Sequence, residues 1–372
     1  MVLMVLDHVR DYFGAPGNPT DPARATVALF FTRWITHLCA PTFFLLAGTG
    51  AYLARRRRST GELSRFLFTR GVWLIVLELT LLRCFGYQFN VDYRVTMLII
   101  LWALGWSMIA LAALVHLPVP AIAAIGVTMI AAHNLFDSVR AASFGAFAPV
   151  WTMLHAQGVV SATSDHVVFA AYPLIPWIGV TAAGYGLGQV FTWPSDRRRA
   201  FLLRLGAALT VAFIALRAAN IYGDPVRWTT QASAVRTALS FLNATKYPPS
   251  LVFLLMTLGP ALIVLSRADR GTPRELRPAL LFGRVPLFYF LLHLPLIHLL
   301  AVGVCFMRYG TAHWMFESPT LDRFPVTRPP GWGYSLPIVY AIWIGVVVAL
   351  YPLCVWFAGV KARRQDAWLA YL

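Results

Sequence analysis

Long apolar stretches separated by short polar segments run along almost the whole chain. About 20 apolar residues span the hydrocarbon core of a bilayer as a helix, and about ten stretches approach or exceed that length. The pattern therefore predicts an all-α protein with about ten transmembrane helices, folded as a single membrane domain over residues 1–372. The approximate limits of the stretches are 1–13, 28–54, 66–87, 93–116, 119–137, 166–192, 199–218, 247–266, 279–305 and 333–358.

The first stretch is short for a membrane span. Thirteen residues at about 1.5 Å each rise about 20 Å, against a hydrocarbon core of about 30 Å. We therefore expect that some residues of the natural domain lie upstream of this helix, or that the helix is completed in another way. Residues 1–13 have neither the basic region nor the small-residue cleavage site of a signal peptide.

Composition supports the membrane interpretation. Of the residues, 59% are hydrophobic and 12% are charged, and the mean hydropathy is +0.66, which excludes an ordinary soluble domain. The net charge of +16 would suit a nucleic-acid partner, but the arginines fall in short blocks between apolar stretches, so we expect none. The cysteines stand singly without metal-ligand spacing, which predicts free buried thiols and no metal site; they are Cys39, Cys84, Cys305 and Cys354.

The arginine blocks predict the orientation in the membrane. If ten helices alternate, the blocks fall on one side, which the positive-inside rule makes cytoplasmic, and both termini lie there too. The other side carries the longer loops, and we expect short helices within 138–165 and 219–246. The blocks are 55–70, 197–204, 267–284 and 361–364.

The strongest candidate for chemistry is the cluster that ends the first stretch. On a helix, His8 and Asp11 are three residues apart and Asp7 and Asp11 are four apart, so they share a face. A carboxylate beside an imidazole stabilises the imidazolium, as a general base requires, and ionisable groups in membrane segments mark functional sites. The alternative is a helix end whose polar groups only meet water and lipid headgroups.

Further polar residues lie inside other stretches. A Pro/Gly loop brings His37 back toward His8, and the glycines that follow it permit either close helix packing or passage of a ligand. Glu78 and Arg83 are expected to pair with each other or to contact substrate. His293 and His298 are five residues apart, about 140° around a helix, so each is either a proton-transfer group or a buried, hydrogen-bonded histidine. Metalloprotease, nucleotide-hydrolase and serine-hydrolase motifs do not occur.

Several segments together resemble a known family. They are Met1–Phe13 with its Asp-His-Val-Arg-Asp run, 31–48 around His37, 172–179, the Lys-Tyr-Pro-Pro-Ser run at 246–250, and 283–293. They resemble the bacterial branch of the heparan-α-glucosaminide N-acetyltransferase family over nearly the whole chain.

The resemblance implies a membrane acyltransferase that takes acetyl-CoA from the cytoplasm and acetylates an amino sugar on the far side. In this scheme His8 is the base, Asp7 or Asp11 orients it, and His37 is a second base or acyl carrier. The resemblance also implies that arginines on the cytoplasmic side bind the CoA phosphates. For this donor site we select Arg284 and His293.

The sequence thus predicts an acetyl-CoA-dependent N- or O-acetyltransferase of the bacterial inner membrane, acting on a cell-envelope saccharide or related acceptor, with a homodimer left open. One rival is a transporter or flippase for a lipid-linked or small hydrophobic solute. Another is a non-catalytic membrane partner, for which changes at His8 and His37 would be silent.

Overall fold

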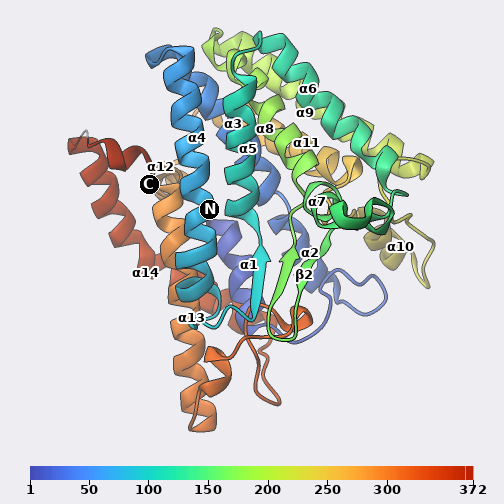
Figure 1. Cartoon of the computed structure of the whole chain (residues 1–372), viewed down its shortest axis with the longest axis vertical. Coiled ribbons are helices and arrows are strands. Elements are labelled where there is room, and N and C mark those ends of the chain that lie inside the picture. Colours follow the sequence, from blue (N-terminus) through green and yellow to red (C-terminus); the bar gives the residue numbers. More distant parts are fainter. Residues whose placement is uncertain (365, 372) are drawn as a thin grey trace.

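The computed structural model describes residues 1–364 and 366–371, and most of them are helical (Figure 1). The α-helices are α1 (Val2–Phe13), α2 (Val27–Thr36), α3 (Cys39–Ala54), α4 (Thr60–Leu77), α5 (Ile100–Leu114), α6 (Val119–Ala132), α7 (Ala148–Leu154), α8 (Leu174–Leu187), α9 (Ser195–Ala219), α10 (Ala234–Leu242), α11 (Leu251–Ala268), α12 (Arg277–Arg284), α13 (Pro286–Tyr309) and α14 (Leu336–Arg363). A π-helical segment, Glu78–Tyr87, continues α4. The strands are β1 (Val95–Leu98), β2 (Gly158–Ala162) and β3 (Val167–Ala170).

Seven helical segments of the described chain are long and apolar enough to cross a membrane. This confirms the prediction of an all-α, multi-pass membrane protein, and each of the ten predicted stretches contains a helix. The segments are Val27–Arg57, Val119–Phe136, Leu174–Thr192, Ser195–Ala219, Leu251–Ala268, Pro286–Tyr309 and Leu336–Arg363.

Helix α1 lies inside the bundle. Val5, Val9 and Tyr12 are fully buried, and the helix packs against α2, α13 and α14. The Tyr12 hydroxyl donates to the carbonyl oxygen of Gly86 at 3.1 Å, which ties α1 to the π-helical segment. The charged side chains of α1 are part-buried, between 12% and 33% exposed, so they do not form a fully solvated chain end.

A small sheet replaces helix at two places where apolar stretches predicted helix. β1 and β3 pair in parallel, and β2 pairs antiparallel with β3, in the order β1-β3-β2. The strands are rich in β-branched residues, which favour an extended chain. In a short apolar run, however, the hydrophobic periodicity does not distinguish a strand from a helix. The short helices α7 and α10 do lie in the two long loops where they were expected.

The polar loops meet at one end of the bundle. Arg236 donates to the carbonyl oxygen of Pro22 at 2.8 Å, and the Asn90 amide donates to that of Phe316 at 3.0 Å. At an arginine-rich junction, Arg198 donates to the Asp269 carboxylate through Nε and Nη2, which joins the start of α9 to the end of α11. Figure 1 shows the sheet beyond the lower ends of α5 and α8.

Candidate active site

Two joined cavities lie around the second half of α1. The outer cavity has a volume of about 980 Å³ and is bordered by the loops at 15–20, 243–247 and 322–332. The inner cavity, of about 200 Å³, lies deeper against α1, α3 and α13. The residues that line both cavities form the neck between them, and they are Asp11, Arg33, Gln157, Lys246, Tyr247 and Phe324.

His8 lines the inner cavity. Its Nδ1 lies 3.9 Å from Asp11 Oδ2, an ion-pair separation that is too long for a hydrogen bond. The ring of His293 lies on another side of His8, with the ring centroids 5.1 Å apart. His8 is thus an imidazole with a carboxylate beside it and a cavity in front of it, which is an arrangement suited to proton transfer.

The carboxylates of Asp7 and Asp11 have different partners. Asp7 accepts hydrogen bonds from Arg10, at 3.0 Å, and from Arg33 of α2, so both of its oxygens are bound by guanidinium groups. Asp11 also pairs with Arg10, but its second oxygen faces His8. The geometry therefore places Asp11, and not Asp7, beside the imidazole.

His37 lines the outer cavity, while His8 lines the inner one. It follows the last residue of α2, is 4% exposed, and packs against Phe253 with ring centroids 5.4 Å apart. Its Nδ1 has no hydrogen-bond partner among the described residues. The two histidines predicted to act together therefore face two different cavities, which meet at the neck.

The two residues predicted for the donor site, His293 and Arg284, lie in different parts of the structure. His293 contacts His8, its Nδ1 donates to the Tyr289 carbonyl oxygen at 3.2 Å, and its buried Nε2 has no partner in the described chain. Arg284 is an exposed residue at the end of α12, and it lines neither cavity. The structure thus brings His293 to His8 and Asp11 and leaves Arg284 apart from them.

Three neck residues, Arg33, Lys246 and Gln157, were not singled out from the sequence. The sequence does contain a signal that could have identified Lys246, because it is one of two lysines in a chain with 31 basic residues. The carboxylates of Asp7 and Asp11 are paired with arginines, and Lys246 has no ion-pair partner in the described part of the chain. The neck therefore carries positive charge that no carboxylate neutralises.

Tyr247 shares this charged environment. The Lys246 ammonium lies 5.0 Å from the centroid of its ring, and the ring of Tyr172 packs edge-on against it. Burial disfavours ionisation of Tyr247, but the positive charges of Lys246 and Arg33 outweigh it and hold the pKa of the phenol below its ordinary value. The neck is thus suited to polar or anionic ligand groups.

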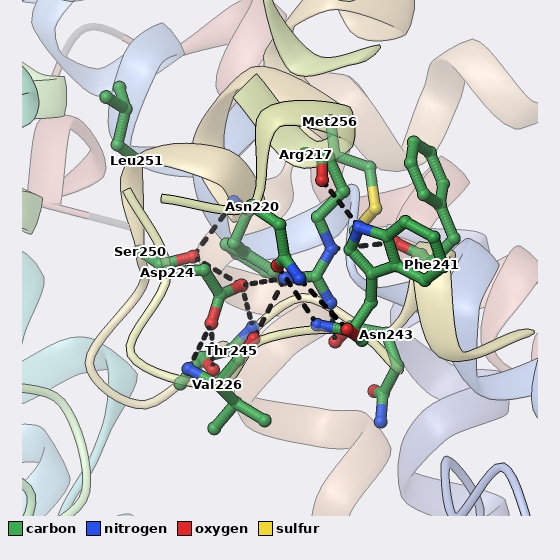
Figure 2. Close-up of polar contacts among 12 residues, drawn as sticks. Arg217, Asn220, Asp224, Val226, Phe241, Asn243, Thr245, Ser250, Leu251 and Met256 are labelled. Carbon is green, nitrogen blue, oxygen red and sulfur yellow. Dashed lines mark hydrogen bonds and ion pairs between the residues drawn. The ribbon is translucent and has the colours of Figure 1, made fainter. Parts of the chain in front are cut away.

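A buried ion pair positions the loop that carries Lys246 and Tyr247 (Figure 2). Arg217, at the end of α9, lies 3.3 Å from Asp224 and is 2% exposed. Its guanidinium also donates to backbone carbonyl oxygens, those of Val226, Ser240, Phe241 and Asn243. Asp224 in turn accepts from the backbone nitrogen and hydroxyl of Thr245, at 3.0 and 2.6 Å. Asp224 thus holds Thr245, one residue before Lys246, and also accepts from the Ser250 hydroxyl at 3.2 Å, so the network fixes the chain on both sides of Lys246.

The other intramembrane polar residues have structural partners. Glu78 accepts a hydrogen bond from the backbone nitrogen of Leu101 at 2.8 Å, while Arg83 binds Asp92 at 3.1 Å. The two residues do not pair with each other, since Glu78 binds the start of α5 and Arg83 binds the loop after the π-helical segment. His298 is buried between two carbonyl oxygens, that of Met315 at 2.7 Å from Nε2 and that of Gly86 at 3.3 Å from Nδ1, and a neutral imidazole donates to one of them. It is therefore the buried, hydrogen-bonded histidine that one interpretation expected.

The fold and the cavities define a multi-pass membrane protein with a histidine–carboxylate cluster inside its helical bundle. Residues 1–222, more than half of the chain, match the family model described as heparan-alpha-glucosaminide N-acetyltransferase, catalytic, and the chain belongs to this family. The match includes Asp7, His8, Asp11 and His37 and ends before Lys246 and α13. Membership supports a membrane acetyltransferase type of function. No curated protein and no solved structure matches the chain.

Proposed function

We propose that the protein transfers an acetyl group from acetyl-CoA to an amino or hydroxyl group of a cell-envelope saccharide or related acceptor, with His8 as the general base. The observation that carries the proposal is the position of His8, beside Asp11, on an inner cavity that a polar neck connects to a larger outer one. Family membership supports the reaction type.

The proposed step needs one proton acceptor and one leaving group. The acceptor's amine or hydroxyl attacks the thioester carbonyl carbon while His8 takes its proton. The tetrahedral intermediate then releases the CoA thiolate, which receives the proton from the imidazolium, giving acetylated acceptor and free CoA. Asp11 stabilises the imidazolium, which is the task of a carboxylate beside a catalytic histidine.

Cavity size separates the two substrates in this scheme. Sites for drug-sized ligands have volumes of about 300–1,000 Å³, so the inner cavity suits only the thioester end of the donor, whereas the outer cavity suits a saccharide. His37 then contacts the acceptor. We place the rest of the donor on the apolar side of the inner cavity, at Met4, Phe43 and Phe290, with Arg284 toward its phosphates.

The test uses the full chain in lipid nanodiscs with radiolabelled acetyl-CoA, a panel of amino sugars and an envelope glycan extract. We expect label in the acceptor and release of CoA. His8→Ala should reduce the rate about 10²-fold or more while acetyl-CoA binding persists, because only proton transfer is lost.

The matched control is His313→Ala, since His313 is an exposed residue that lines neither cavity. This variant should keep the wild-type rate. Full activity in His8→Ala would remove His8 from the base role, and absence of label in every acceptor would overturn the transfer reaction.

A transporter or flippase is the second candidate, because two cavities joined by a polar neck also suit passage of a solute. Counterflow of an unmodified solute in proteoliposomes, without any acetylated product, would favour that function.

A further inference from the structure

A cluster of metal-ligating side chains lies outside the two cavities. His133 and Asp137 follow the end of α6, and His155 directly follows α7. One donor atom from each residue lies within 4.8 Å of the other two, and His155 Nε2 is 3.4 Å from Asp137 Oδ1. Ligands around a tetrahedral zinc ion, with bonds of about 2.0–2.1 Å, lie about 3.3 Å apart, so one edge of the cluster already has that length.

The two imidazoles are buried without adequate hydrogen bonds. His133 is 1% exposed, and among the described residues neither of its ring nitrogens has a hydrogen-bond partner. His155 is 3% exposed, and its Nδ1 has none either. Buried polar groups in native proteins are nearly always hydrogen-bonded, so packing alone does not account for two such histidines side by side.

The third side chain of the cluster, Asp137, has a hydrogen-bond partner of the kind that usually orients a metal ligand. The Asn134 amide donates to Asp137 Oδ2 at 2.8 Å, which leaves Oδ1 directed at His155. Asn134 itself is held through its Oδ1, which accepts from the backbone nitrogen of Leu251 at 2.9 Å. Carboxylate ligands of metals are commonly oriented by such partners.

We propose that His133, Asp137 and His155 bind a divalent transition-metal ion of the zinc class. Two imidazole nitrogens and one carboxylate oxygen are a donor set that suits zinc and disfavours magnesium and calcium. The Asp137 side chain is 22% exposed, which gives the ion access from solvent and leaves the fourth position to water.

The metal joins the end of α6 to the turn between α7 and β2. Gln157 lies two residues after His155 and lines both cavities, and β2 begins at the next residue. The ion therefore holds Gln157 at the neck, and this consequence rests on the proposed function, whereas metal binding itself does not.

The experiment measures metal binding and does not require activity. The full chain, purified without a polyhistidine tag and treated with a chelator, is titrated calorimetrically with zinc chloride and, for comparison, with magnesium chloride. We expect one zinc per chain and no magnesium. Asp137→Asn, and separately the double variant with His133→Ala and His155→Ala, should weaken zinc binding by about 100-fold or more, since removal of outer partners alone costs about 10–100-fold.

His313→Ala is the matched control, because it removes an exposed histidine that pairs with Glu317 at 2.7 Å and is itself capable of weak zinc binding. It should leave the affinity unchanged. Equal zinc affinity in the wild type and Asp137→Asn, or no zinc bound by the wild type, would overturn the proposal. Asp137→Asn decides the matter if the double variant does not fold.

Discussion

Asp7 and Asp11 lie one helical turn apart on α1, yet their surroundings give them different tasks. Asp7 lies between two guanidinium groups, and its side chain is 14% exposed. Removing one partner of a buried ion pair leaves the other charges uncompensated, which costs about 3–5 kcal/mol. Asp11 is 33% exposed and pairs closely with Arg10 through one oxygen, while its second oxygen lies 3.9 Å from His8 Nδ1, so it is the carboxylate beside the imidazole.

The first prediction compares Asp7→Asn with Asp11→Asn. Asp7→Asn should lower the free energy of unfolding by about 3–5 kcal/mol, because Arg10 and Arg33 lose their shared carboxylate. Asp11→Asn should lower the free energy of unfolding by less than Asp7→Asn does. It should also lower the rate of acetyl transfer at least about tenfold, because the imidazolium loses its counter-charge. Denaturation in one detergent and the radiolabel assay measure the two effects. The opposite distribution of the effects would show that Asp7, and not Asp11, supports His8.

At the scale of elements, glycines allow the helices to cross closely. A Cβ added at Gly48 of α3 would lie 1.9 Å from the carbonyl oxygen of Thr181 in α8, and one at Gly184 would lie 2.2 Å from that of Leu45. The Thr49 hydroxyl donates to the Gly184 carbonyl oxygen at 3.0 Å across the same contact. Gly48 lines neither cavity, so it serves packing and not passage of a ligand.

The second prediction uses two glycines on the same helix. Gly48→Ala should destabilise the protein by about 1–3 kcal/mol, since the backbones of α3 and α8 must separate. Gly50→Ala is the control, because no atom lies within 4 Å of the position its Cβ would take. It should leave the thermal unfolding midpoint unchanged or slightly higher. Equal midpoints for both variants would contradict the close crossing.

At the scale of the whole molecule, the two ends of the bundle differ in chemistry. The outer cavity is bordered by the polar loops, whereas the arginine runs at 55–58 and 197–199 lie at helix junctions and line neither of the two cavities. Clusters of arginine next to membrane spans favour the cytoplasmic side. We therefore place the opening of the outer cavity on the side away from the cytoplasm.

The third prediction tests this orientation with Ser164→Cys, at the loop-rich end, and Gly61→Cys, at the start of α4. Both positions are exposed, and the native cysteines are buried or partly buried. A membrane-impermeant thiol reagent should label Ser164→Cys in intact cells and Gly61→Cys only after the membrane is opened. The reverse labelling pattern would invert the proposed topology.

Local patterns in the sequence were enough to predict the helices and the shared helix face of His8 and Asp11. The apolar stretches identified the helices, since a span must satisfy its backbone hydrogen bonds internally and present apolar side chains to lipid. The spacing of His8 and Asp11 placed them on one face of α1, because three residues make nearly one helical turn. Lys246, one of the two lysines, was equally visible in the sequence, but nothing in its local pattern indicated that it lies at a neck between cavities.

Tertiary structure decided the rest, because contacts between distant segments depend on how helices pack and not on any repeat along the chain. It brought Arg33 to Asp7, left Arg284 outside the cavities and gave His37 a different cavity from His8. It also brought His155 to His133, although 21 residues and two helical segments separate them in the chain. A chemical site of this kind exists only where the bundle encloses it, since no single helix supplies all of its groups and the packing of several segments sets the distances between them.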